Sequence, residues 1–257
     1  MAEVLLAAEG LVKQFGGLTA TDNLSLEVRA GEIHALIGPN GAGKTTVVSQ
    51  LSGMLAPSSG RILFEGRDIT RLAMPARVRL GLARSFQITS VLKDFTALDN
   101  VALAVQAHRG HSFRFWTDFR KDEDLRVPAR RMLDLVDLGP RADTLAARLS
   151  HGEQRQLEIA MAMAEEPKVL LLDEPMAGMG PEESSRLVKL LQSIRGRHAI
   201  LLVEHDMDAV FALADRITVL VYGRAIATGT ADEIRQNPEV RSAYLGEEDT
   251  SAFGSGI

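Results

Sequence analysis

The spacing of hydrophobic and polar residues divides the chain into three stretches. In the first, up to about residue 87, short apolar runs between turns predict strands, and a pattern of helical period follows the third of them. The second stretch, up to about residue 148, shows only helical spacing, and the third returns to strands alternating with helices. The predicted strands are residues 4–8, 24–28, 32–37, 61–64, 168–172, 199–203 and 217–221, and the predicted helices are residues 43–55, 98–107, 129–138, 181–195 and 207–214.

This alternation predicts the fold class and the domain organisation. Strands that alternate with helices are typical of a parallel sheet, and such sheets bind ligands beyond the C-terminal ends of their strands. We therefore expect an α/β core formed by residues 1–87 and 149–249, with a β-rich N-terminal part. A helical subdomain should be inserted at residues 88–148, and the small, polar residues 250–257 should form a flexible tail.

Composition narrows the range of partners. The chain has 257 residues, 46% of them hydrophobic and 25% charged, and its net charge of -5 argues against nucleic acid as a partner. Cysteine is absent, which excludes a disulfide framework. The longest apolar stretches are far shorter than the roughly 18 residues of a spanning helix, and residues 1–10 lack the basic start of a secretory signal. Any membrane role is therefore expected from the water side.

The clearest chemical motif follows the third predicted strand. Residues 38–45 match the phosphate-binding pattern G-x-x-x-x-G-K-[ST], in which glycines let backbone N–H groups point at phosphate oxygens. The helix that follows adds the positive end of its dipole. Lys44 should reach the β- and γ-phosphates, and the Thr45 hydroxyl should ligate Mg²⁺. The predicted ATP contacts here are Gly38, Pro39, Asn40, Gly41, Ala42, Gly43, Lys44, Thr45 and Thr46.

A second candidate site element lies at the end of a later strand. Four apolar residues, 169–172, precede Asp173 and Glu174. Because successive strand residues point to opposite sides, the two carboxylates can take different roles. Asp173 fits a Mg²⁺ ligand, directly or through water, and Glu174 fits the general base that polarises the attacking water. An acidic turn after a strand is the alternative, and the phosphate-binding loop makes it the weaker one.

Three further segments resemble one family of nucleotide hydrolases, the ABC ATPases. Residues 149–154, Leu-Ser-His-Gly-Glu-Gln, resemble the signature motif of that family, usually written LSGGQ. Gln87 stands where the family has the glutamine of its Q-loop, and His205 stands where it has its switch histidine. The order of all these motifs is that of the family. The resemblance covers residues 4 to about 247 and implies the P-loop ABC ATPase fold.

The resemblance also implies roles for residues that chemistry alone leaves open. Ser150, Gly152 and Glu153 would bind the nucleotide held by the P-loop of a second ATPase subunit. Gln87 would contact Mg²⁺ and take part in catalysis, and His205 would contact the γ-phosphate and orient the water and Glu174. Taken alone, the signature residues could equally be a capped helix start, and His205 a structural residue. Phe15 would stack on adenine, with core packing as the alternative.

Departures from the common family pattern point to one branch. His151 and Glu153 replace the usual Gly and Gln of the signature, and Gly180 stands where many relatives have an Asp that bridges the dimer. Together with residues 15–18, 203–207 and 243–247, they resemble importers of branched-chain and other hydrophobic amino acids, and their urea or amide relatives. Residues 108–127 look like the additional helical sequence of the longer ATPase in such a pair.

That branch implies an assembly at a membrane. The expected partners are two transmembrane permease subunits, a second homologous ATPase subunit or a second copy of this chain, and, indirectly, an external solute-binding protein. The chain would then lie on the cytoplasmic face of the membrane. ATPases of lipid exporters share the Tyr-Leu-Gly ending at residues 244–246, so an exporter remains an alternative. A soluble ABC ATPase acting on DNA or ribosomes is the third, although a basic face and a long coiled coil are lacking.

Two surface segments are candidates for docking. In ABC proteins a short cytoplasmic helix of the permease docks after the Q-loop, so residues 91–96 are expected to meet it. Residues 113–120 mix aromatic and basic side chains and could dock on a permease or pack within their own subdomain. His108 and His111 could share a helix face, but two histidines alone make a poor metal site.

Overall fold

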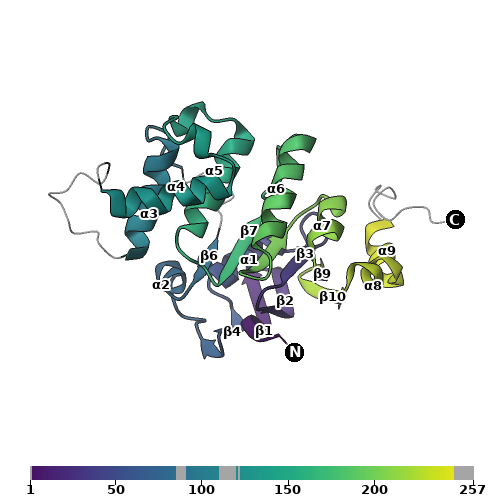
Figure 1. The fold of residues 1–257 in the computed structure, drawn as a ribbon. Coiled ribbons are helices and arrows are strands. Elements are labelled where there is room, and N and C mark those ends of the chain that lie inside the picture. The colour runs from purple at the N-terminus through teal and green to yellow at the C-terminus, as the bar shows by residue number, and fades with distance from the viewer. Residues whose placement is uncertain (1, 85–90, 110–119, 121, 246–257) are drawn as a thin grey trace.

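The computed structural model of the protein describes residues 2–84, 91–109, 120 and 122–245. It contains two sheets and a group of helices beside them (Figure 1). An antiparallel sheet of order β2-β1-β4-β5 comes from the N-terminal part, as the sequence predicts. Its strands are β1 (Val4–Phe15), β2 (Leu18–Arg29), β4 (Ser59–Phe64) and β5 (Arg67–Asp68). Because β1 and β2 pair along their whole length through several bulges, both are longer than predicted.

The second sheet has the order β10-β9-β3-β8-β7-β6, and only β10 is antiparallel to its neighbour. The predicted strands near residues 32–37, 168–172, 199–203 and 217–221 are confirmed. Two strands of this sheet, β6 and β10, were not predicted. The strands are β3 (Ile33–Ile37), β6 (Leu82–Arg84), β7 (Val169–Asp173), β8 (Ala199–Val203), β9 (Arg216–Val221) and β10 (Arg224–Gly229).

Helices cover the parallel sheet and form a separate group at one end of the molecule, where α3, α4 and α5 contact one another (Figure 1). The helices are α1 (Lys44–Ser52), α2 (Met74–Arg79), α3 (Ala97–Arg109), α4 (Glu123–Leu135), α5 (His151–Met163), α6 (Pro181–Ile194), α7 (Met207–Leu213), α8 (Ala231–Gln236) and α9 (Pro238–Leu245). Short 3₁₀ turns occupy Gly139–Arg141 and Ala146–Arg148. Since α5 belongs to this group, helical packing continues past residue 148, and the boundary of the inserted subdomain stays a prediction.

Helix α4 begins six residues before its predicted start at 129, so Pro128 lies inside it. The Asp122 side chain caps the helix by accepting a hydrogen bond from the Asp124 N–H at 3.0 Å. Pro128 is the sixth residue of the helix, beyond the first turn in which proline removes no bond, so its missing N–H removes one intrahelical hydrogen bond and the helix tolerates this loss.

The alternation of side chains along β7 determines on which side of the sheet Asp173 lies. Leu170 and Leu172 face the core that the sheet shares with the helical group, whereas Val169 and Leu171 face the core shared with the antiparallel sheet. Asp173 follows the parity of Leu171 and therefore lies on the side of α1.

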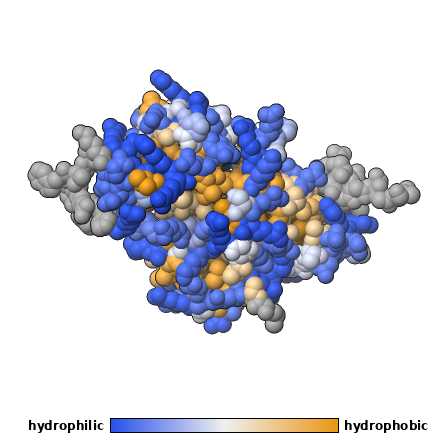
Figure 2. All heavy atoms as spheres, viewed as in Figure 1, coloured by the Kyte–Doolittle hydropathy of each residue, from blue (hydrophilic) through white to orange (hydrophobic). Residues whose placement is uncertain are grey.

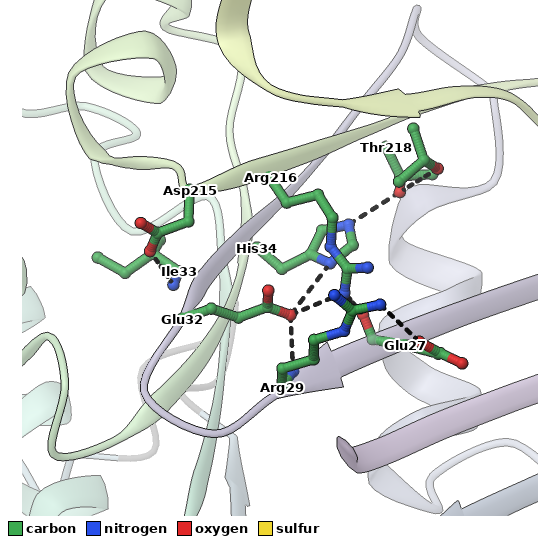
Figure 3. A network of polar contacts seen from close by, with 9 residues as sticks. Glu27, Arg29, Glu32, Ile33, His34, Asp215, Arg216 and Thr218 are labelled. Atoms are coloured by element: carbon green, nitrogen blue, oxygen red, sulfur yellow. Dashed lines mark hydrogen bonds and ion pairs between the residues drawn. The ribbon is translucent and has the colours of Figure 1, made fainter. Parts of the chain in front are cut away.

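A polar network joins the N-terminal ends of β3 and β9 (Figure 3). A Glu32 carboxylate oxygen accepts hydrogen bonds from the Arg29 N–H at 2.6 Å and from Arg216 at 2.8 Å. His34 is buried; its Nε2 lies 2.8 Å from the Thr218 hydroxyl and its Nδ1 3.6 Å from Glu32. Burial lowers the pKa of His34, although the Glu32 carboxylate opposes that shift. The network fixes the strand that leads into the phosphate-binding loop.

None of the helices in the described part of the chain combines the length and the apolar character that crossing a membrane requires. Figure 2 shows hydrophobic residues at the surface in the middle of the viewed face, with hydrophilic residues around them.

Candidate functional site

The predicted phosphate-binding loop joins the end of β3 to the start of α1. Gly43 has a φ of 104°, and a Cβ added there would lie 2.2 Å from the Ala20 carbonyl oxygen, so only glycine fits. The Lys44 ammonium donates to the carbonyl oxygens of Gly38 at 2.6 Å and Pro39 at 3.0 Å. The lysine charge is therefore held directly beside the loop.

This loop borders a cavity of about 460 Å³. The cavity gathers most of the site residues predicted for the nucleotide, from segments far apart in the sequence. It also includes residues that were not predicted, among them Leu18 and Tyr222. The lining consists of Phe15, Leu18, Thr19, Ala20, Asn40, Gly41, Ala42, Gly43, Lys44, Thr45, Thr46, Glu174, His205 and Tyr222.

Glu174 and His205 meet at the cavity wall. The His205 Nε2 lies 2.6 Å from a Glu174 carboxylate oxygen. Glu174 follows β7 with a φ of 52°, in the left-handed region that non-glycine residues seldom adopt, and its N–H donates to the Val203 carbonyl at 2.8 Å. The unusual backbone turns this residue out of the strand, so its carboxylate reaches the cavity and the histidine.

Asp173 lies behind the cavity, at the buried end of β7. Its Oδ2 accepts a hydrogen bond from the Arg84 guanidinium at 2.9 Å, whereas its Oδ1 is buried without a hydrogen-bond partner in the described part of the chain. Burial raises the pKa of Asp173, and the positive charge of Arg84 acts in the opposite direction. An acceptor oxygen that is buried and unpartnered is suited to a cation or to a donor such as water.

Glu204 is a site residue that sequence reasoning missed. It is buried, and its carboxylate accepts hydrogen bonds from the Met176 N–H at 2.7 Å and the His205 N–H at 3.1 Å. Burial raises its pKa, and these two hydrogen bonds counteract the rise. The side chain thus ties the loop after Glu174 to the backbone of His205. The available signal was an acidic residue directly after the apolar strand at 199–203.

Two aromatic rings lie at the rim of the cavity. Phe15 is 49% exposed and Tyr222 86% exposed, so neither ring is packed in the core. Lys13 places its ammonium 5.2 Å from the centre of the Phe15 ring. The exposed ring leaves a face available for stacking, and stacking on adenine stays a prediction.

The predicted signature residues do not line this cavity. Ser150 is the N-cap of α5: its hydroxyl accepts from the Glu153 N–H at 3.2 Å, and the Glu153 carboxylate accepts from the Ser150 N–H at 2.8 Å. Arg141 also pairs with Glu153 at 3.1 Å. The Glu153 side chain therefore holds the helix start in this structure, and a role for it at a nucleotide stays a prediction.

A second unpredicted residue, Glu183, fills the space beside the signature. The Ser150 hydroxyl donates to its carboxylate at 3.4 Å, and the Gly180 N–H donates to the same group at 3.2 Å. A Cβ added at Gly152 would lie 2.5 Å from the Glu183 carboxyl carbon, so the missing side chain of Gly152 makes room for this contact. The start of α6 thus meets the start of α5.

Several predicted segments lie wholly or partly outside the described residues. Gln87 is among them, as are His111 and residues 113–119. Of residues 91–96, Leu92 borders a second cavity of about 380 Å³ between α2, β6, α3 and α5. Phe95 does not line that cavity, and its ring lies 5.5 Å from the Arg120 guanidinium.

Comparison with known proteins decides the family. A family model described as "ABC transporter" matches residues 21–177, more than half of the chain. This chain belongs to the ABC transporter family. A second model, described as "Branched-chain amino acid ATP-binding cassette transporter", matches residues 226–250. The ABC ATPase fold and the family predicted from the sequence are thereby confirmed.

Curated relatives of this ABC protein match it over almost its full length. The "High-affinity branched-chain amino acid transport ATP-binding protein LivG" of Salmonella typhimurium is 41% identical, covering 96% of this chain and 100% of the relative. The corresponding protein BraF of Pseudomonas aeruginosa is 39% identical with the same coverage. A solved structure of the ADP conformation of an ATP-binding cassette superposes with a TM-score of 0.83 at 29% identity, covering 95% of this chain and 99% of that one.

Proposed function

We propose that this ABC protein binds and hydrolyses ATP to power the import of branched-chain or other hydrophobic amino acids. The observation that carries the proposal is the cavity in which the P-loop, Glu174 and His205 converge. The match of residues 226–250 to a branched-chain amino acid transporter model supports the choice of substrate. So do the names of relatives such as LivG and BraF.

In the proposed reaction the protein positions ATP and activates a water molecule. The loop amides and Lys44 hold the phosphates, and Phe15 offers its exposed ring to adenine. Glu174 accepts a proton from the attacking water, while His205, whose Nε2 lies 2.6 Å from a Glu174 carboxylate oxygen, holds the carboxylate in place and lines the same cavity.

Magnesium fits the donors present at this site. Thr45 supplies a hydroxyl in the cavity, and Asp173 supplies a buried carboxylate with one unpartnered oxygen. Gln87 is a third predicted ligand, outside the described residues. Bound Mg²⁺ would neutralise charge on the β- and γ-phosphates. No group of three His, Cys, Asp or Glu gathers among the described residues to hold a metal, so phosphate and water oxygens would complete the coordination.

Two ATPase subunits are proposed to act together at the cytoplasmic face of the membrane. Ser150 and Gly152 lie outside the cavity of their own chain, which supports their use at the nucleotide of a second subunit, similar or identical. The cavity that Leu92 borders is mostly apolar, and a short helix of a permease subunit would dock there. Two permease subunits would carry the solute, delivered by an external binding protein.

An exporter is the rival that a specific observation supports. The lipopolysaccharide export ATP-binding protein LptB of Haemophilus influenzae is 32% identical to this chain. Identity to LivG is higher, and the C-terminal model names branched-chain amino acids.

Uptake measurements in cells distinguish import from export. Deletion of the gene should abolish uptake of radiolabelled leucine, isoleucine and valine. The wild-type chain should restore it, and the Glu174→Gln variant should not. Unchanged uptake together with lost export of a lipid to the cell surface would reject import in favour of export.

A further inference from the structure

A buried ion pair connects the ends of two neighbouring strands beside the nucleotide cavity. Arg84 is the last residue of β6, and Asp173 is the last residue of β7, which runs parallel to it. The Arg84 Nη2 lies 2.9 Å from the Asp173 Oδ2, and only 6% and 0% of the two side chains are exposed. Water therefore does not screen the pair, and the hydrogen bond between them is charge-assisted.

The other terminal nitrogen of the guanidinium is held by α1, the helix that begins at Lys44, whereas the Nε is buried without a hydrogen-bond partner among the described residues. Its Nη1 donates to the hydroxyls of Ser49 at 3.2 Å and Ser52 at 3.3 Å. Arg84 therefore links the helix of the P-loop to the carboxylate of β7. Each end of the guanidinium has a partner, so the group has little freedom to rotate.

Arg84 contacts only one of the two oxygens of the Asp173 carboxylate. Arginine often binds both oxygens of a carboxylate, but here it binds Oδ2 alone and leaves Oδ1 buried without a hydrogen-bond partner among the described residues. A hydrogen bond to one oxygen restricts rotation of the carboxylate and so favours one direction for the other oxygen. Groups that hold a metal ligand in this way raise metal affinity by orienting it.

Arg84 also borders the second cavity. It lines the apolar groove together with Leu92, Leu103 and Met161. One side chain therefore touches both the wall of the proposed permease site and the carboxylate beside the nucleotide.

We propose that Arg84 is a positioning residue that holds Asp173 in the orientation required to bind Mg²⁺ with the nucleotide. The proposal rests on the proposed role of Asp173 in Mg²⁺ binding. Arg84 touches neither the nucleotide nor the metal, and acts only through the Asp173 carboxylate. Its loss should therefore weaken nucleotide binding that depends on Mg²⁺ and leave binding without Mg²⁺ nearly unchanged.

The test is a binding titration with a fluorescent ATP analogue, with Mg²⁺ and with EDTA, on the purified full chain. In Arg84→Gln we expect the Mg²⁺ concentration for half-maximal binding to rise about 10- to 100-fold, with less than about a 2-fold change in EDTA. Arg84→Lys, which keeps one charged donor, should show a smaller rise. If Arg84→Gln does not fold, the Lys variant decides.

Arg77→Lys is the matched control, because Arg77 is also buried and also donates to α1, at the carbonyl oxygens of Gln50 and Leu51, but does not contact Asp173. It should lower the melting temperature without changing the Mg²⁺ dependence. Equal loss of binding with Mg²⁺ and with EDTA in the Arg84 variants, or an unchanged or lower Mg²⁺ requirement, would overturn the proposal. If the wild type bound the ATP analogue equally well with Mg²⁺ and with EDTA, the result would instead contradict the proposed role of Mg²⁺ itself.

Discussion

Two regions of this chain differ in how much of a nucleotide site each contains. The P-loop region is the cavity lined by the P-loop, Glu174 and His205, and the signature region is the start of α5. Around the P-loop, Lys44, Glu174 and His205 come from three separate segments and line one cavity. Around the signature, Ser150 and Gly152 lie at the start of α5 and face Glu183. The first region holds the groups predicted to bind phosphate and to act as the base, and the second holds a helix N-terminus with a carboxylate against it. The difference supports the proposal that one chain supplies two unequal parts of a nucleotide site.

The two regions are also held differently. The P-loop follows the buried strand β3, Lys44 donates hydrogen bonds to the Gly38 and Pro39 carbonyl oxygens, and Gly43 packs closely against the Ala20 backbone. The signature is held by side chains, through the Ser150–Glu153 cap and the contact with Glu183. A phosphate and the Glu183 carboxylate are both anionic, so a nucleotide arriving at Ser150 must displace the glutamate. We therefore expect the P-loop region to bind ATP alone and the signature region to act only in an assembly.

The largest effect should come from Glu174→Gln. Removing the general base should lower the ATPase rate of the assembled transporter about 10²- to 10⁴-fold, because the amide cannot accept the proton from water. ATP affinity of the isolated chain should change little, since Lys44 and the loop remain. Phosphate release and nucleotide binding measure the two effects. Glu182→Gln, an exposed change at the start of α6, is the control, and normal turnover in Glu174→Gln would remove Glu174 from the role of base.

Ser150→Ala tests the separation of the two regions directly. Losing one hydrogen bond to a charged phosphate should lower the ATPase rate of the assembly about 10- to 100-fold. The ATP affinity of the isolated chain should stay within about 2-fold, because Ser150 does not line the P-loop cavity. The exposed Ser185→Ala is the matched control. An equal loss of ATP affinity in the isolated chain would show that the signature and the P-loop of one chain belong to the same nucleotide site, and would reject their separation.

Phe15→Ala should have a smaller effect, confined to the P-loop region. Loss of ring stacking should weaken ATP binding by the isolated chain about 2- to 10-fold. Phe15→Tyr, which keeps the ring, should retain wild-type affinity. Leu18→Ala is the control, since Leu18 lines the same rim without a ring. Affinity that is unchanged in Phe15→Ala would contradict stacking on this ring.

Sequence reasoning succeeded where local pattern and motif carried the information. The strand Ala199–Val203 was predicted at its observed bounds because all five residues are apolar, and in the structure all five are buried. Asp173 and Glu174 were selected because two adjacent carboxylates follow an apolar strand. In the structure Glu174 lies beyond β7 with a left-handed backbone, so strand parity is not what separates the two, and their roles stay predictions. The P-loop needs only residues that are consecutive in the chain.

Prediction failed where the role of a residue depends on a partner that is far away in the sequence. Strand β6 was missed because it has three residues and ends in Arg84, whose burial depends on Asp173, 89 positions away. Glu183 gains its contact with Ser150 only when the fold brings the starts of α5 and α6 together. Glu204 binds the backbone of Met176, 28 positions earlier. The identity of such residues is visible in the sequence, but their partners follow only from the tertiary fold.

The last expected effect lies at the junction of the two regions and concerns stability, not ATP binding or turnover. Glu165 follows α5 and borders the apolar groove, and burial raises its pKa from 4.5 to about 7. The folded state therefore holds a proton there that the unfolded chain has lost, so stability should fall as pH rises from about 4.5 to 7. Glu165→Gln removes this penalty and should raise the free energy of unfolding on the order of 1–3 kcal/mol at pH 8, with little change at pH 5.

Urea unfolding at the two pH values measures the effect, with the exposed neighbour Glu166→Gln as control. A gain for Glu165→Gln that is equal at both pH values would show that packing, and not the buried charge, limits stability there. A gain only at high pH would show that the groove between the regions holds a carboxylate without a compensating charge. Docking of a basic permease segment could then supply that charge, and it should stabilise the wild type more than Glu165→Gln.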